Sequence, residues 1–377
     1  MGQEQFLKGV HHYTRLISLY LNQKEDPEYE VSDGKFSFFL KLSKGHSLSA
    51  ILYQTLKNVK VKISEDKLNQ LEVYYVANVK KTTGFDKERK ALYQDFNENG
   101  IDYLPLKGII LKDYYPDPSV REFADNDILF DDAKSDLMKS LFVKRGYDVV
   151  LFKKSNHDVY QKKPFFNFEM HRALFYEMED NTQYVKYYQN FLEKAPLKEG
   201  HEHYLSNEDF YIYFTAHTYK HFRNSGCGIR TLIDYYLFLK KHELDFNYIN
   251  QELTKIDLLD FSNKISSLSI KIFDNESLNQ EEEEMLLYIA SSGTYGSIEH
   301  AVKKGVAKKG KFRYLMSRLF PPMSFYKSAY PWAYKCRILI PIAWLHRFFR
   351  ILFHSPKRAV TEIKIISKQK KDKTKKD

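Results

Sequence analysis

The chain has 377 residues, of which 43% are hydrophobic, so it is long enough to bury a large core over two or three domains. No uninterrupted apolar run reaches about 18 residues, which excludes a predicted membrane-spanning helix, and the N-terminus lacks the regions of a secretory signal peptide. The two cysteines, Cys227 and Cys336, form neither a zinc-ligand spacing nor a disulfide framework. These features predict a cytoplasmic protein.

The formal net charge of +10 is distributed unevenly along the chain. Residues 300–377 carry 21 Lys or Arg against three acids, whereas the other 299 residues carry 38 basic and 46 acidic side chains. The chain therefore has a mildly acidic body and a strongly basic C-terminal fifth. This asymmetry favours an anionic partner for the basic end: lipid headgroups, nucleic acid or the acidic body itself.

The first 98 residues have apolar positions three and four apart, which predicts an N-terminal helical region that ends near Gly100. Residues 99–182 change character and alternate short β-rich runs with helical ones. We expect strands in IDYLPLKG, REFADNDILF, DVVLFKK, HDVYQKK and FFNFEMHRAL, and a helix in DDAKSDLMKSLFVKRGY that is capped by Asp131 or Asp132. The alternation predicts a small mixed sheet.

Helical patterning returns over residues 183–299, which we interpret as a helical domain. Residues 300–361 form a basic aromatic region that prolines interrupt, and residues 362–377 are a low-complexity basic tail that we expect to be disordered. The predicted fold class is therefore α+β, with a small mixed β-sheet core flanked by N-terminal and C-terminal helical regions.

Two aspartates one residue apart, Asp125 and Asp127, stand on a predicted strand. Because alternate residues of a strand share a face, both carboxylates point to one side and Asn126 to the other. The same rule places Glu169 and His171 together on the polar face of a later strand. If these strands are neighbours, three carboxylates converge, and such hard oxygen ligands suit Mg²⁺ or Mn²⁺ in phosphoryl or nucleotidyl transfer.

The residues before the aspartates add a signal for anion binding. PLKG, at residues 105–108, ends a strand and opens a helix, where backbone N–H groups favour phosphate and Lys107 adds a cation. Arg121 follows just upstream of the aspartates. The alternatives are a solvated turn for the aspartate pair and an edge-strand carboxylate in water for Glu169.

The stretch LPLKGIILKDYYPDPSVREFADNDILF, with the later GY (146–147) and FEMHRAL (168–174), resembles the uncharacterised bacterial nucleotidyltransferases of the polymerase-β-like superfamily. In that family an L-K-G turn, an Arg, a D-x-D strand and an E-x-H strand recur in this order. The resemblance implies a nucleoside triphosphate substrate, a phosphate turn at Gly108, and Mg²⁺ or Mn²⁺ held by Asp125, Asp127 and Glu169. It also implies that Glu169 is the general base toward an acceptor hydroxyl.

The resemblance extends to HTYKHFRNSGCGIRTLIDYYLFL, a segment that matches the recurring H-x-x-K-H and G-I-R-x-x-x-D positions. Taken with the turn, it implies a set of nucleotide-binding residues: Lys107, Gly108, Arg121, His217, Lys220, His221, Arg230 and Asp234. Asn126 stands where the family usually has an apolar residue, which disfavours burial of that strand on both faces.

The residues of this helical segment also allow interpretations that do not depend on the resemblance. His217 and His221 lie one helical turn apart, which allows either a zinc site or a structural pair, and Asp234 lies where it can pair with Arg230. The glycines of NSGCGIR precede a helix, which is a modest signal for anion binding.

Two functions of different classes fit these patterns. The first is a metal-dependent nucleotidyltransferase that moves a nucleoside monophosphate to an acceptor hydroxyl with release of pyrophosphate. The acceptor stays open among a small molecule, a saccharide or lipid-linked intermediate, a protein and an RNA, and the basic end favours one in cell-surface polysaccharide metabolism. The alternative is a non-catalytic protein of this fold that binds nucleic acid or anionic membrane through its basic C-terminus.

The apolar stretch CRILIPIAWLHRFFRILFHSPKR bears on the partner of the basic end, because Pro341 interrupts it and it is too short to span a bilayer. It either lies in the interface of a membrane or packs on the core as a C-terminal helix. The first reading predicts peripheral contact with anionic lipid at the inner face of the membrane.

Overall fold

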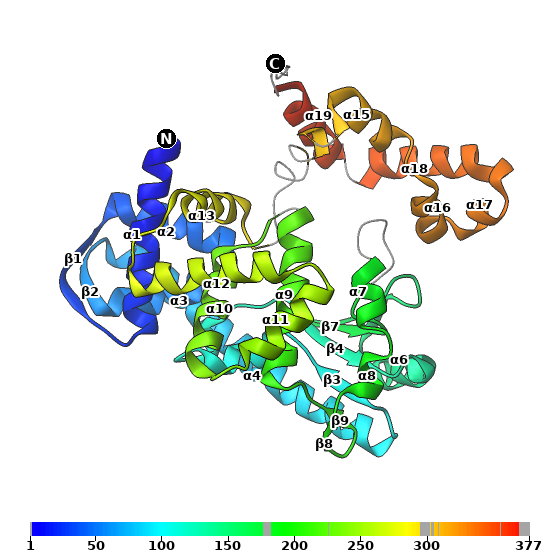
Figure 1. The fold of residues 1–377 in the computed structure, drawn as a ribbon, viewed down its shortest axis with the longest axis horizontal. Helices are drawn as coiled ribbons and strands as arrows, with labels where there is room; N and C mark the ends of the chain where they lie inside the picture. Colours follow the sequence, from blue (N-terminus) through cyan, green and yellow to red (C-terminus); the bar gives the residue numbers. More distant parts are fainter. Residues whose placement is uncertain are drawn as a thin grey trace. The chain divides into compact units, whose positions relative to one another are not determined.

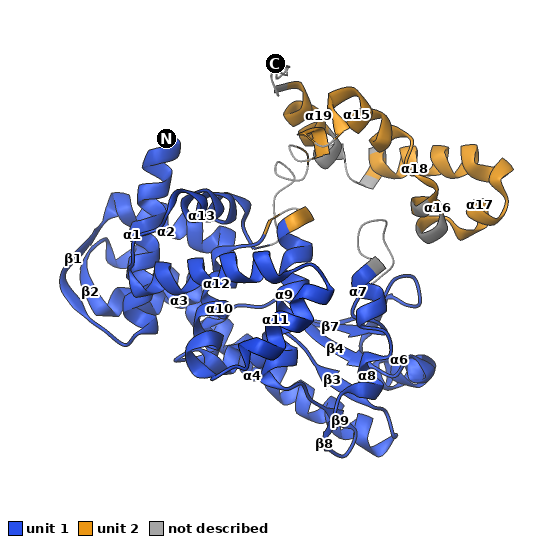
Figure 2. Ribbon diagram, viewed as in Figure 1, with its two compact units in different colours: residues 1–222, 227–294 blue, residues 223–226, 295–377 orange. Residues whose placement is uncertain are grey.

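A computed structural model of the chain describes residues 2–175, 182–224, 226–294, 302, 305–307, 309–354 and 356–368. The chain divides into two compact units (Figure 2). The larger unit holds residues 1–222 and 227–294, and the smaller unit holds residues 223–226 and 295–377. The segments expected at 1–98 and 99–182 both fall in the larger unit.

A mixed sheet of seven strands forms the centre of the larger unit (Figure 1). Its strands are β3 (Tyr103–Pro105), β4 (Asn126–Phe130), β5 (Asp148–Leu151), β6 (His157–Lys162), β7 (Phe166–His171), β8 (Leu197–Glu199) and β9 (Glu202–His203). Their order across the sheet is β5-β6-β7-β4-β3-β9-β8. Strand β4 lies parallel to β7 and antiparallel to β3, while β3 lies parallel to β9.

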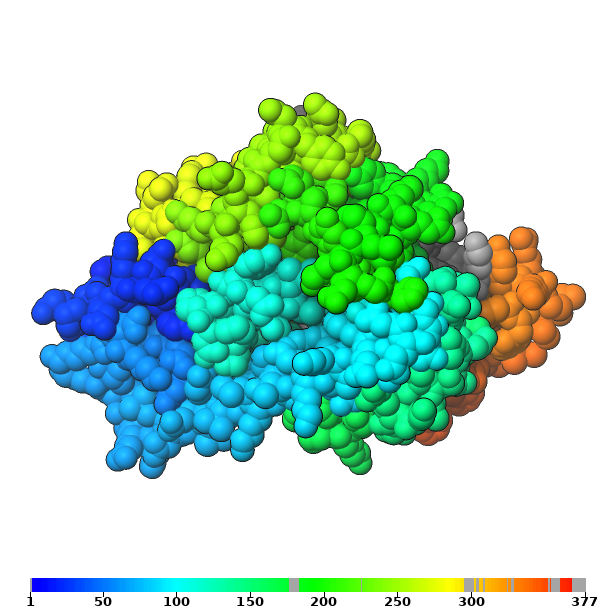
Figure 3. All heavy atoms as spheres, turned by 90° about the horizontal axis from the view of Figure 1, so that it is seen from below, coloured from blue at the N-terminus to red at the C-terminus, as the bar shows by residue number. Residues whose placement is uncertain are grey.

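The short elements between these strands follow the expected order along the chain. They are α5 (Gly108–Leu111), η2 (Lys112–Tyr114), η3 (Pro118–Val120), η4 (Asp132–Lys134) and α6 (Ser135–Lys144). The predicted cap is confirmed, because the side chain of Asp131 accepts a hydrogen bond from the backbone N–H of Ala133. Sequence patterns predicted the five strands β3 to β7 and missed β8 and β9. In Figure 3 the cyan segment near residue 100 lies against the green segment near residue 200, as the β3–β9 pairing requires.

Helix α4 (Glu65–Glu98) covers one face of this sheet. From Asn78 to the end of the helix, its buried residues recur three or four apart, as expected for one face of a helix. They are Asn78, Thr82, Phe85, Arg89, Leu92 and Phe96. Gly100 follows the helix with a φ of +61°, a left-handed conformation that glycine adopts without strain. The predicted end of the helix is therefore confirmed.

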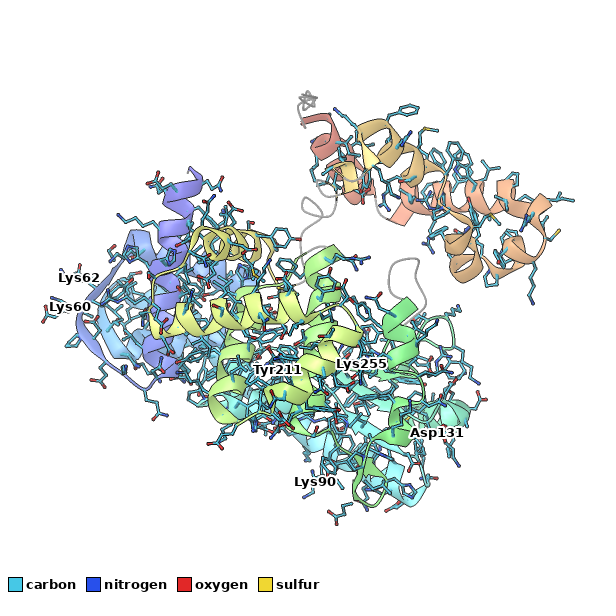
Figure 4. The ribbon with its side chains drawn as sticks, in the orientation of Figure 1. Lys60, Lys62, Lys90, Asp131, Tyr211 and Lys255 are labelled. Atoms are coloured by element: carbon cyan, nitrogen blue, oxygen red, sulfur yellow. The ribbon has the colours of Figure 1, made fainter. Side chains whose placement is uncertain are left out.

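The N-terminal region is largely helical, as predicted, with α1 (Gln3–Leu21), α2 (Asp33–His46), α3 (Ser49–Thr55) and η1 (Leu56–Asn58). The prediction missed a small parallel pair of strands, β1 (Asp26–Ser32) and β2 (Val59–Lys62). Strand β2 reads VKVK, and its alternation leaves Lys60 and Lys62 exposed at the outer edge (Figure 4).

Among the described residues of the larger unit, seven helices follow or flank the last strands, so the segment predicted to be helical is mainly helical but also holds β8 and β9. They are α7 (Thr182–Tyr187), α8 (Phe191–Lys194), α9 (Asn207–Asn224), α10 (Ile229–Lys241), α11 (Phe246–Lys255), α12 (Leu259–Asp274) and α13 (Gln280–Ser292). They share one hydrophobic core with the N-terminal helices. Within it, the buried hydroxyl of Tyr211 (Figure 4) lies 2.7 Å from that of Ser262 and 2.6 Å from that of Ser266.

The smaller unit consists of short helices: α15 (Lys311–Leu319), α16 (Met323–Ala329), α17 (Pro331–Lys335), η5 (Arg337–Leu339), α18 (Ile340–His354) and α19 (Pro356–Lys368). Helix α19 enters the segment 362–377 for which we expected disorder, and residues 369–377 lie outside the described residues. Over the described parts of both units, no helix has the length and apolar character needed to span a bilayer. The prediction of an α+β protein is confirmed.

Candidate active site

Strands β4 and β7 bring the predicted acidic residues together. They pair in parallel, with Asp127 directly opposite Glu169 and Leu129 opposite His171. Phe168 and Met170 pack on the other face, in the cluster beneath α4. Asp127, Glu169 and His171 therefore share one face of the sheet, as predicted. Asp125, which was predicted on the same strand, lies just before it, because β4 begins at Asn126.

Asp127 is almost fully buried, with 5% of its surface exposed, and two donors meet one of its oxygens. The Oδ1 atom accepts hydrogen bonds from Lys107 Nζ at 2.8 Å and from His171 Nε2 at 2.7 Å. Burial raises the pKa of Asp127, but Lys107 and His171 outweigh burial and hold this pKa well below its usual range. Asp127 is therefore ionised throughout the physiological range.

The pKa values of Glu169 and Asp125 are raised, whereas that of Asp127 is lowered. Burial, followed by the charges of Asp127 and Asp125, raises the pKa of Glu169 to about 7. Burial and the charge of Asp127 likewise raise the pKa of Asp125, which lies just before β4. Burial and the charge of Asp127 therefore disfavour ionisation of both carboxylates, and the nearby cation Lys107 only partly opposes this effect.

The donor set fits a divalent cation. Asp127, Glu169 and His171 each offer a ligand atom, and these atoms all lie within 4.8 Å of one another. Two carboxylates and an imidazole suit Mn²⁺, and the carboxylates with Asp125 also suit Mg²⁺. A cation here would also relieve the repulsion that raises the pKa of Glu169. His217 and His221 lie outside this group, although the Nε2 atom of His221 lies 3.2 Å from that of His217.

The turn that carries Lys107 has a strained backbone. Lys107 has a φ of +46° and ψ of −114°, between strand β3 and the four-residue helix α5. The preceding Leu106 donates its backbone N–H to the carbonyl of Asp127 at 3.0 Å. This arrangement fixes the turn beside β4 and directs the Lys107 ammonium to the carboxylate of Asp127.

Gly108 is required for a reason that the sequence did not reveal. A Cβ atom at this position would lie 2.7 Å from Nη1 of Arg121. That guanidinium is fixed, because its Nε and Nη2 atoms donate to the two oxygens of Asp234, each at 2.8 Å. The glycine therefore makes room for a buried ion pair, in addition to any role toward phosphate.

Asp234 is fully engaged by its neighbours. Besides Arg121, the hydroxyl of Tyr115 donates to its Oδ1 atom at 2.8 Å. Arg121 and Asp234 are 4% and 3% exposed, so they are bonded to each other within the protein and do not face solvent. The expected pairing of Asp234 with Arg230 was wrong: the Nη1 atom of Arg230 donates to the backbone carbonyl of Glu122.

Asn126 points away from the aspartates and is fully buried. Its Oδ1 atom accepts a hydrogen bond from Nη1 of Arg89 on helix α4, and its Nδ2 atom donates to the carbonyl of Asn167 at 3.3 Å. The expectation that this asparagine disfavours burial on both faces was wrong, because Arg89 satisfies it under the sheet.

Helix α9 supplies His217, Lys220 and His221. Burial and then the charge of Lys107 lower the pKa of Lys220, while Asp127 and Glu169 oppose that shift. Burial and Lys107 also lower the pKa of His217. Lys107 therefore acts electrostatically on both side chains, and Lys220 also interacts with Asp127 and Glu169.

The side chain of His46 accepts a hydrogen bond from the first backbone N–H group of helix α10. The backbone N–H of Ile229 donates to Nδ1 of His46 at 3.0 Å, and Nε2 of His46 lies 3.0 Å from the carbonyl oxygen of Ala290. A Cβ atom at Gly228 would lie 2.9 Å from the same imidazole. Gly228 of NSGCGIR thus makes room for the side chain of His46.

Three further residues of the site were missed by sequence reasoning as functional residues. His171 was placed on the correct face but given no role, and its Nδ1 atom is buried without a partner among the described residues. His157, opposite His171 on β6, lies 3.8 Å from Glu169. Lys81 of α4 interacts electrostatically with Asp125. His157 pairs with His171, so its place in the site depended on the strand register, which the sequence did not show.

Comparison of the sequence with known protein families matches residues 32–274 to a family described as an uncharacterised nucleotidyltransferase. The matched segment covers more than half of the chain and contains every site residue from Lys81 to Asp234. A search of curated proteins and a search of solved structures gave no match.

Proposed function

The chain belongs to this family of uncharacterised nucleotidyltransferases, and we propose that it moves a nucleoside monophosphate from a nucleoside triphosphate to an acceptor hydroxyl. It is accordingly an enzyme that transfers a phosphorus-containing group. In the proposed reaction, the acceptor oxygen forms a bond to the α-phosphorus, the bond to the β-phosphate oxygen breaks, and pyrophosphate leaves. We further propose that the family is part of the polymerase-β-like superfamily.

Asp125, Asp127 and Glu169 would hold Mg²⁺ or Mn²⁺, with His171 beside them. The bound cation would neutralise charge on the triphosphate and on the leaving pyrophosphate. The permanently ionised Asp127 is the anchor of this site, because Lys107 and His171 hold its pKa low.

Glu169 is suited to receive the proton of the acceptor hydroxyl. Its pKa of about 7 lies close to neutral pH, where a general base is most effective. Lys107, Lys220 and Arg230 provide the positive charge for the phosphates, and His217 and His221 line the same side on helix α9. The imidazoles are neutral at pH 7 and would bind through hydrogen bonds.

Arg121, Asp234 and Gly108 act one step away from the nucleotide in this proposal. The buried Arg121–Asp234 pair ties the segment before β4 to helix α10, and Gly108 packs against it. The pair therefore positions the Lys107 turn, and its contribution to nucleotide binding is indirect.

The observation that carries the proposal is the β4–β7 register, which sets Asp127 opposite Glu169, with Lys107 bonded to Asp127. The test is to incubate the purified protein with Mn²⁺ and each of four α-labelled nucleoside triphosphates, with a cell extract as the source of acceptor. We expect Asp127→Asn to lower label transfer by about 1000-fold or more.

Asp136→Asn is the matched control, since that carboxylate lies on helix α6 with its side chain 82% exposed and should leave transfer unchanged. Normal labelling by Asp127→Asn would show that the site is elsewhere. For the acceptor we propose a hydroxyl of a cell-surface polysaccharide precursor at the cytoplasmic face of the membrane; fractionation of the labelled extract tests this.

A further inference from the structure

The smaller unit exposes much more apolar surface than the larger one. Of the 24 large hydrophobic side chains that are exposed among the described residues, 15 belong to residues 312–363. The buried hydrophobic cluster of this unit consists of Tyr326, Tyr330, Ala333 and Ala343. Apolar side chains gathered on a surface in this way mark a site of interaction.

Helix α18 displays its apolar residues along one stripe. Ile342, Leu345, Phe349 and Phe353 follow a spacing of three and four residues and are 56%, 48%, 52% and 76% exposed. The opposite side of the helix is already engaged: Trp344 Nε1 donates to the carbonyl of Leu319 at 2.7 Å. The orientation of the helix within the unit therefore turns the stripe outward.

Helix α15 repeats the pattern. Phe312, Leu315 and Leu319 lie three and four residues apart and are 73%, 37% and 40% exposed. Arg347 of α18 donates from Nη2 to the carbonyl of Arg318 at 2.8 Å, which joins the two helices at the end of α15. Two amphipathic helices in contact thus both leave apolar faces uncovered.

The positive charge of this unit indicates what kind of partner its apolar surface binds. Between His300 and Thr361 the sequence has 14 Lys or Arg and no Asp or Glu. Arg337, which precedes helix α18, and Arg350 within it are exposed cations, which suits a partner that is anionic at its surface and apolar beneath it. Exposed aliphatic groups, such as the 86% exposed Ile338, suit acyl chains better than the stacking faces of nucleic-acid bases.

We propose that helices α15 and α18 form a docking surface for an anionic lipid bilayer. The helices lie in the interface, with Phe349 and Phe353 at the level of the upper acyl chains and the Lys and Arg side chains at the headgroups. The surface belongs to the smaller unit, so this proposal is independent of the transferase reaction.

The test uses the full chain and sedimentation with vesicles of phosphatidylcholine, with or without phosphatidylglycerol. Both tryptophans, Trp332 and Trp344, lie in the smaller unit, so tryptophan emission reports on this unit alone. We expect binding only to the anionic vesicles, a blue shift of the emission, and weaker binding at higher salt. No binding to the anionic vesicles would overturn the proposal.

Two variants and a matched control locate the surface. Ile342→Ser/Phe349→Ser/Phe353→Ser should weaken binding by more than tenfold, and Arg337→Gln/Arg350→Gln by about fivefold for each charge removed. The control removes three equally exposed apolar side chains from the larger unit, Val73→Ser/Val143→Ser/Val150→Ser, and should bind as the wild type does.

Equal binding by the triple stripe variant and the wild type would contradict the proposal. So would retention of a single-stranded RNA without retention of vesicles, or a dimer in solution that the stripe variant dissociates while vesicles are ignored. Circular dichroism of each variant verifies that the helices remain folded, and the charge variant tests the surface even if the stripe variant unfolds.

Discussion

Two buried aspartates of the larger unit, Asp234 and Asp127, are each paired with a cation but differ in how their oxygens are used. In Asp234 both oxygens accept bonds, from Arg121 and Tyr115. In Asp127 a single oxygen accepts both bonds, from Lys107 and His171, and further carboxylates crowd around it. We call the Arg121–Asp234 pair closed, because both carboxylate oxygens accept bonds, and such a pair stabilises the fold. We call the Asp127 site open, because one oxygen takes both donors and other carboxylates lie close by, and such a site is suited to bind a cation.

The same substitution at both positions gives the largest expected contrast in stability. Asp234→Asn places an amide N–H₂ against a donor of Arg121 or Tyr115 and leaves a buried guanidinium without its counter-ion. It should lower the free energy of unfolding by about 3–5 kcal/mol. Asp127→Asn removes the main counter-ion of Lys107, but Asp125 still acts on that lysine and the amide keeps an acceptor oxygen for it, so the loss should be smaller, about 1–2 kcal/mol.

Urea denaturation followed by circular dichroism measures both values. Since Trp332 and Trp344 lie in the smaller unit, the far-ultraviolet signal is the appropriate probe of the larger one. Equal stability losses for the two variants would remove the distinction between a closed and an open pair.

Gly108→Ala tests the Arg121–Asp234 pair by adding a methyl group that contacts the guanidinium of Arg121. The added Cβ would lie 2.7 Å from Nη1 of Arg121, which cannot withdraw without breaking its bonds to Asp234. We expect a loss of about 1–3 kcal/mol in the free energy of unfolding, measured by the same denaturation. Gly34→Ala is the control, because nothing lies within 4 Å of its added Cβ; similar losses in both variants would contradict the packing argument.

The open site should show a pH dependence that the closed pair lacks. The pKa of Glu169 is raised to about 7, and a cation binds the deprotonated form. The affinity for Mn²⁺ should therefore rise about fivefold between pH 6 and pH 7, about tenfold between pH 6 and pH 8, and level off above pH 8. Titration calorimetry at several pH values measures it.

Glu169→Gln provides the control for this titration. The variant should bind Mn²⁺ more weakly and lose most of the pH dependence, because the titrating group is absent. An unchanged pH profile in this variant would assign the dependence to another residue.

Local patterns were enough to predict the acidic face. Period-two alternation is a property of a strand itself, so the facing of Asp127, Glu169 and His171 could be predicted from the sequence. The end of α4 at Gly100 is equally local. The predicted meeting of the carboxylates required only that the two acidic strands be neighbours. The order of the strands and the parallel direction of β4 and β7 were not predicted.

Contacts distant in sequence could not be predicted in this way. The partners Arg121 and Asp234 are separated by 113 positions, so the local i, i+4 rule instead favoured Arg230. His46 meets Ile229 across 183 positions, and Arg89 satisfies Asn126 from a helix under the sheet. Burial makes each of these pairings favourable, and burial is decided by the tertiary fold.

The central claim is that the carboxylates of β4 and β7 bind a divalent cation, and crystals grown with MnCl₂ and a non-hydrolysable nucleoside triphosphate test it most directly. An anomalous difference map should show a Mn²⁺ peak bonded to oxygens of Asp127 and Glu169, at about 2.0–2.3 Å, and crystals of Asp127→Asn should lack it. A bound nucleotide with no anomalous peak between these strands, or with its metal held elsewhere, would contradict the claim.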